Sequence, residues 1–183
     1  MGVSMSLYAA EPDELDAAIR AVATEPAPTR SGIFGLFRRG RSKPPVSHLE
    51  DFIHAGIEGH DEWTDDLDKA WDVIMNALNQ LHAAGKADQA VTEAVAGEHS
   101  GQGGPMGEFG WVSAPRVSAV STALSAISAE AFAEAAKVVP DDVYLYDLLK
   151  EDGPEYFVEN FERLKTFYDR AAAAGRAVVL TAC

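Results

Sequence analysis

The chain has 183 residues, 47% of them hydrophobic, and a formal net charge of −14 from 29 acidic and 15 basic residues. This length gives one domain with its own core, and a mean hydropathy of −0.10 excludes a disordered chain. The acidic surplus excludes general nucleic-acid binding, because phosphate backbones repel such a surface. No apolar run approaches the about 20 residues that cross a bilayer, and no secretory signal is visible. We therefore expect a cytoplasmic protein that binds neither membranes nor nucleic acid.

The first predicted elements are a strand and a helix. Val3, Met5 and Leu7 alternate with polar residues, which is the pattern of a half-buried strand. Pro12, in a first turn rich in acidic residues, begins a helix. This helix ends before Pro26.

The segment from about 24 to 45 differs in composition from the rest of the chain. It is rich in proline and glycine and contains a basic run, which predicts a flexible insertion. Apolar residues followed by cations could engage a partner groove. The alternative is that the aromatic residues fold back onto the core while the cations lie on the protein's own acidic face. The candidate partner-binding residues are Phe34, Phe37, Arg38, Arg39 and Arg41.

Two helices are predicted in the middle of the chain. The first runs from about Ser47 to Ile57, and Gly56 and Gly59 end it. The second, the strongest in the chain, runs from Asp65 to about Ala84 and is closed by Gly85. Its apolar stripe has the spacing of one helix face and consists of Leu67, Trp71, Ile74, Leu78 and Leu81.

A glycine-rich connection is predicted from about 97 to 110, because glycines are frequent there and apolar periodicity is lost. Phe109 to Val112 can enter as a short strand. Ser113 and Ser128 then cap two further helices.

The last predicted elements are a helix and a strand. A last helix starts near Asp152 and carries an aromatic face, and a strand follows from 177 to 180. Pairing of this strand with the first one is the natural closure of the sheet. The predicted fold class is α+β: a single helix-rich domain over 1–183, with a small mixed sheet that includes the N- and C-terminal strands.

No cofactor or metal site is predicted. Cys183 is the only cysteine, so no Cys pair can build a zinc site. Glu50, His54 and Glu58 have the spacing of one helix face and could ligate a divalent metal. Gly56 argues against a helix that persists through Glu58, and a solvated acidic surface is the simpler interpretation.

A candidate ligand site combines two tryptophans and two cations. Lys69, Trp71, Trp111 and Arg116 could surround one cleft near the glycine-rich loop and hold an anionic or aromatic ligand. The structural alternative makes Trp71 a core anchor, and this interpretation is preferred because aromatic residues at helical spacing are usually packing.

The sequence resembles the YfbM-like family, also known as domain of unknown function 1877. The resemblance is carried by the Met1 to Tyr8 start, by Leu67 to Trp71, by the Gly110 to Val117 junction and by Phe161 to Val179. It implies a single-domain bacterial protein with a mixed α+β fold. The family supplies no catalytic residues, so none can be transferred to this chain.

The leading functional hypothesis is a non-enzymatic binding or regulatory domain that acts on a basic protein partner or a small ligand. It rests on the net negative charge and on the lack of any recognisable active-site pattern. The alternative is a small hydrolase-like enzyme built from convergent histidines and carboxylates. A deep pocket with two or more such groups beside a tryptophan would favour the enzyme.

Overall fold

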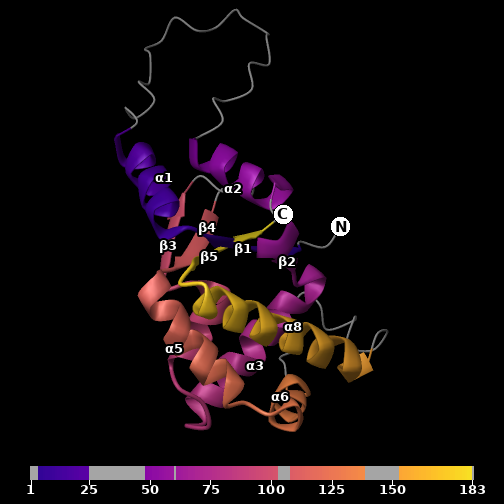
Figure 1. Ribbon diagram of the computed structural model, residues 1–183. Helices are drawn as coiled ribbons and strands as arrows, with labels where there is room; N and C mark the ends of the chain where they lie inside the picture. Colours follow the sequence, from indigo (N-terminus) through magenta and orange to yellow (C-terminus); the bar gives the residue numbers. More distant parts are fainter. Residues whose placement is uncertain (1–3, 25–47, 60, 103–107, 139–152, 183) are drawn as a thin grey trace, which may run out of the picture.

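Five antiparallel strands form one sheet between two layers of helices (Figure 1). The computed structural model describes residues 4–24, 48–59, 61–102, 108–138 and 153–182. The strands, in the spatial order β2-β1-β5-β4-β3, are β1 (Met5–Ala10), β2 (Thr64–Asp66), β3 (His99–Gln102), β4 (Glu108–Val112) and β5 (Ala177–Ala182). The helices are α1 (Pro12–Thr24), α2 (His48–Gly59), α3 (Trp71–Ala83), α4 (Ala90–Ala96), α5 (Ala114–Ser125), α6 (Ala129–Ala136) and α8 (Gly153–Ala173), with short 3-10 helices η1 (Asp61–Trp63) and η2 (Asp68–Ala70).

The centre of the sheet joins the two strands that lie furthest apart in the sequence. β1 pairs with β5 in a register from Met5 opposite Ala182 to Ala10 opposite Ala177. The predicted α+β class and the predicted pairing of the terminal strands are therefore confirmed. The described strand pairs are all antiparallel, so the sheet is not mixed.

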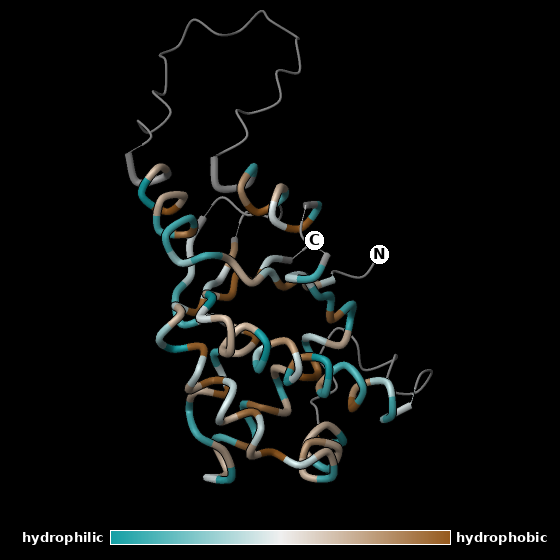
Figure 2. Tube along the Cα trace, in the orientation of Figure 1, coloured by the Kyte–Doolittle hydropathy of each residue, from teal (hydrophilic) through white to brown (hydrophobic). Residues whose placement is uncertain are grey.

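Alternation along the strands divides the core into two clusters. Met5, Leu7 and Ala9 of β1 belong to the main cluster with α3, α4, α5, α6 and α8. Tyr8 and Ala10 point to the opposite face and belong to a smaller cluster under α1 and α2. Hydrophobic and hydrophilic residues alternate along the helices (Figure 2). None of the described helices combines the length and apolarity that crossing a bilayer requires.

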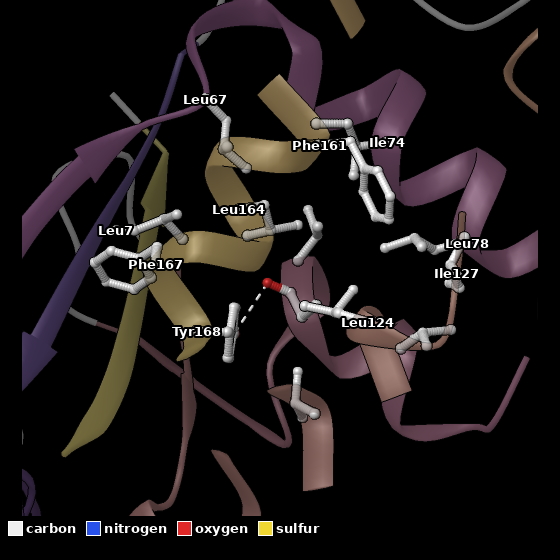
Figure 3. Close-up of a cluster of buried hydrophobic side chains, with 14 of the residues drawn as sticks. Leu7, Leu67, Ile74, Leu78, Leu124, Ile127, Phe161, Leu164, Phe167 and Tyr168 are labelled. Atoms are coloured by element: carbon white, nitrogen blue, oxygen red, sulfur yellow. Dashed lines mark hydrogen bonds between the residues drawn. The ribbon is translucent and has the colours of Figure 1, made fainter. Parts of the chain in front are cut away.

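The main core is organised around α8. The ring of Phe161 stacks on that of Phe132 from α6, with 4.1 Å between ring centroids and 4° between ring planes. Two turns further along α8, the buried Tyr168 hydroxyl donates to the carbonyl of Ala94 in α4 at 3.0 Å (Figure 3). This hydrogen bond satisfies a polar group that would otherwise be costly to bury. The predicted aromatic face of the last helix is thus the centre of the core.

The long middle helix begins later than its apolar stripe predicts. Its expected first turns form β2 and η2 instead, and α3 starts at Trp71. The Leu67 amide donates to the Met5 carbonyl at 2.9 Å, which keeps this backbone beside β1. Asp68 then takes φ of 46°, in the left-handed region, and this interrupts a right-handed helix. Pairing with β1 therefore overrides the local helical pattern.

Two predictions based on glycine were also wrong. Gly56 does not end α2 but lies inside it. The position requires glycine because a Cβ there would stand 2.4 Å from the Tyr8 ring. The glycine lets α2 approach the sheet closely. The stretch from 97 to 110 contains a strand, β3, which pairs with β4 from His99 opposite Trp111 to Gln102 opposite Glu108. The short α4 was not predicted.

Candidate functional site

The four predicted ligand-binding residues do not surround one cleft. Trp71 is half-buried against the main core, as the structural alternative expected, and Lys69 lies beside it in η2. Trp111 packs against the smaller cluster on the opposite face of the sheet. Arg116, in the first turn of α5, is engaged by Glu93 through two hydrogen bonds of 2.6 and 2.8 Å. The helical spacing could not reveal that Trp71 and Trp111 are separated by a sheet.

Lys69 follows a turn that holds η2 against the edge of the sheet. Asp68 accepts a hydrogen bond from the Tyr156 hydroxyl at 2.9 Å, and Asp65 forms an ion pair with Arg163, so two residues of α8 fasten this turn. Asp66 in turn accepts from the Asp68 amide. These contacts give the Leu67–Trp71 segment a structural role, the positioning of α3 relative to α8.

Trp111 and Arg116 do flank a common polar cluster around Glu98. The Glu98 amide donates to the Trp111 carbonyl, and its carboxylate accepts from both the amide and the hydroxyl of Ser113, at 3.0 and 2.6 Å. His99 lies 3.6 Å from the same carboxylate, and its ring contacts that of Trp111. Because Glu98 rather than a histidine contacts the serine hydroxyl, the cluster lacks the arrangement that activates a serine nucleophile. It fastens α5 to the sheet.

Glu98 makes the stability of the fold dependent on acid. Partial burial raises the pKa of Glu98, but the Ser113 hydrogen bonds and the charges of His99 and Arg116 outweigh it, and the pKa lies below its ordinary value of 4.5. A depressed folded-state pKa contributes stability above the unfolded pKa, and this stability is lost as pH falls through the folded pKa. Urea denaturation at neutral and acidic pH should show that Glu98→Gln destabilises the protein at neutral pH and that the difference shrinks in acid. An equal difference at both pH values would contradict this, and Glu155→Gln is the charge-matched control.

The feature that best fits a binding site is a groove between α1 and α2. It has a volume of about 440 Å³, is open to solvent, and is lined by Tyr8, Glu14, Ala17, Ala18, Phe52, Ala55 and Gly56. The Tyr8 and Phe52 rings meet edge to face, with 5.9 Å between centroids. Small residues on the facing sides of both helices leave the space, and the two rings form an aromatic wall. The sequence did not predict this site, because a helix that ends at Gly56 would not place this glycine in the wall of a groove.

The groove has a negative electrostatic character. Burial, with the charge of Glu14 as the next cause, raises the pKa of the Tyr8 hydroxyl, which places the Glu14 carboxylate close to it. Arg176 also acts on the Tyr8 hydroxyl and lowers its pKa, but less than burial and Glu14 raise it; this arginine pairs with Glu11 at 2.5 Å, donates to the Ala9 carbonyl and lies over the Trp63 ring. Glu14 is exposed and has no ion-pair partner among the residues that the structure describes.

The helices that form the groove carry most of their charge as carboxylates. Arg20 is the only arginine or lysine within α1 and α2. The exposed acidic side chains of these two helices are Asp13, Glu14, Asp16, Asp51 and Glu58. In the other layer, by contrast, cations alternate with acids and form ion pairs, as Arg116 does with Glu93 and Lys165 with Glu162. Within α1 and α2, exposed carboxylates therefore outnumber cations.

Two further grooves lie beside α6. One, of about 330 Å³, runs between α3 and α6 and includes Lys86, Glu134 and Val138. The other, also about 330 Å³, lies where α6 meets the start of α8 and includes Glu155 and Glu159. No histidine lines these two grooves or the α1/α2 groove within the described chain. The convergent pocket that would favour the hydrolase alternative is not among the three.

Among the described residues, no group of three or more His, Cys, Asp or Glu side chains is arranged so that it could hold a metal ion. The expected break of the helix at Gly56 is wrong: α2 continues through Gly59, so Glu50, His54 and Glu58 belong to one continuous helix. The predicted partner-binding residues of the basic insertion, Phe34 to Arg41, lie outside the described residues.

Comparisons with known proteins give a family and a fold but no activity. The chain resembles the crystal structure of YfbM from Escherichia coli, a protein of unknown function, with a TM-score of 0.59 and 15% sequence identity; the match covers 98% of this chain and 99% of that one. At this identity the likeness establishes the fold. No curated protein matches the chain in sequence. The family model described as domain of unknown function (DUF1877) matches residues 1–181, so the chain belongs to the DUF1877 family.

Proposed function

We propose that the chain is a non-enzymatic binding domain that contacts a basic protein partner through its α1/α2 layer. The observation that carries this proposal is the groove between the two helices, which is mainly apolar and has the Glu14 carboxylate in its lining. The other exposed acids of the two helices are Asp13, Asp16, Asp51 and Glu58. A cationic surface is attracted to the exposed carboxylates of these helices, and Arg20 is the one arginine or lysine within them that opposes it. The geometry around the histidines gives the hydrolase alternative no comparable support.

The proposal predicts salt-dependent binding of a basic peptide to one face of the molecule. A fluorescent peptide of alternating lysine and glycine is a suitable probe, and fluorescence anisotropy at low and high salt measures its affinity. The triple variant Asp13→Asn, Glu14→Gln, Asp16→Asn should bind the peptide at least about tenfold more weakly, because three attractive charges near the groove are removed.

The control separates a specific face from general acidity. Glu134→Gln, Glu155→Gln and Glu159→Gln together remove the same charge from exposed positions of α6 and α8. This control variant should retain nearly the full affinity. Equal weakening of the two variants, or no peptide binding by the unchanged protein at low salt, would refute the proposal.

The basic insertion is a second candidate contact. Phe34, Phe37 and the arginines that follow were predicted to bind a partner. Deletion of residues 30–43 should then weaken binding of the partner. A stronger interaction with the lysine peptide after the deletion would instead favour the alternative, in which the cations of the insertion lie on the protein's own acidic face.

A further inference from the structure

The lining of the α1/α2 groove restricts the kind of cation that it can take. Its walls are the alanine side chains of the two helices, Gly56 and the Phe52 ring, all of which suit an aliphatic stem. Only Glu14 and Tyr8 contribute polar side chains to this described lining. A guanidinium brings five donors in a fixed fork, and several of them would remain unsatisfied here. A primary ammonium brings three donors and is more compact.

The aromatic wall adds a second attraction for a cation. Phe52 is half-buried at this wall, whereas Tyr8 is only 3% exposed and lies directly against Gly56, so Phe52 is the ring whose π-system a bound group can face. The carboxylate of Glu14 stands next to this wall. An aliphatic lining, an aromatic wall and one exposed carboxylate are the elements that alkylammonium recognition requires.

We infer that the groove receives a lysine side chain of the basic partner, with its aliphatic stem against the alanines of α1 and α2 and its ammonium beside Glu14. This inference rests on the proposed function and specifies the group that the site recognises. Its free analogue is n-butylammonium, which carries the same stem and the same charge. Ammonium alone lacks the stem, and n-butanol lacks the charge.

A titration followed by NMR tests the inference on the full chain. n-Butylammonium should produce saturable shifts in the methyl resonances of Ala17 and Ala55, whereas ammonium and n-butanol at equal concentration should not. Ala55→Leu should abolish the shift of the Ala17 methyl, which this variant retains, because the larger side chain fills the groove from an exposed helical position. The matched control, Ala131→Leu, fills the groove between α3 and α6 and should leave the shifts of both methyls unchanged.

Peptide binding separates failure of the inference from failure of the proposed function. Ala55→Leu should weaken the lysine peptide at least about tenfold and the same peptide with arginine much less, because only lysine uses the groove. If both peptides bind as tightly to Ala55→Leu as to the unchanged protein, and only neutralisation of α1 weakens them, the inference is overturned while the proposed function stands. If neither peptide binds the unchanged protein, both fail. Thermal melts should confirm that each variant is folded.

Discussion

Phe161→Ala should be the most destabilising of the aromatic truncations in this fold, with a loss of about 3–5 kcal/mol in the free energy of unfolding. Phe161 is fully buried, and its ring stacks on that of Phe132 with 4.1 Å between centroids. Truncation removes the contacts of the ring and leaves a cavity where α6 and α8 meet, which rigid neighbours fill only in part. The loss is a large fraction of the about 5–15 kcal/mol that stabilises a typical domain. Urea denaturation followed by circular dichroism measures it.

Two further variants serve as controls for Phe161→Ala. Phe161→Leu keeps most of the buried volume and should cost much less than the alanine variant. Val138→Ala changes a side chain that is 66% exposed and should alter stability by less than about 0.5 kcal/mol. A loss below about 1 kcal/mol for Phe161→Ala would show that the centre of the core lies elsewhere.

Gly97→Ala should cost at least about 3 kcal/mol, because two independent effects add at this position. Gly97 has φ of 84° and ψ of 155°, a region that is essentially reserved for glycine. An added Cβ would also stand 2.7 Å from the His99 carbonyl oxygen and 3.0 Å from the Trp111 amide nitrogen. Both contacts are with backbone of the β3–β4 pair, which cannot yield without breaking the ladder.

Gly175→Ala is the matched control for the backbone conformation alone. Gly175 has φ of 67°, and a Cβ there would meet nothing within 4 Å. Its substitution should therefore cost only about 1–2 kcal/mol, the strain of a left-handed residue. Thermal unfolding of both variants gives the comparison. Similar losses for the two glycines would mean that the steric contact at Gly97 is absent in solution.

The parts of the fold that could be predicted are those in which local pattern and tertiary packing agree. Alternation in β1 and the helical stripe of α8 face the cores that they indicate, and Ser128 caps α6 through a hydrogen bond from the Ala131 amide. The start of α3 could not be predicted, because pairing of β2 with β1 depends on residues some sixty positions away. β3 could not be predicted for a different reason: its partner β4 is the next strand along the chain, but β3 lies in the glycine-rich stretch and has no apolar alternation of its own.

The candidate site was harder to predict than the fold, because it depends on how elements face one another. Nothing in the spacing of Trp71 and Trp111 indicates that a sheet separates them. Gly56 was informative in a way that could have been recognised: a glycine inside an amphipathic helix marks a close approach as readily as an end. The aromatic ring that it admits, that of Tyr8, is part of the lining of the groove.

The pairing of β1 with β5 has a consequence for the order in which the protein assembles. β1 leaves the ribosome before β5 and cannot complete its ladder until β5 has been synthesised. Until then, the side of β1 that pairs with β5 has no partner strand. Contacts of such high sequence separation slow folding, since a long loop must close before they form. The nascent chain is therefore expected to expose an unpaired strand edge until β5 has been synthesised, and a ribosome-stalled chain truncated before residue 177 should bind hydrophobic dyes that a chain containing β5 excludes.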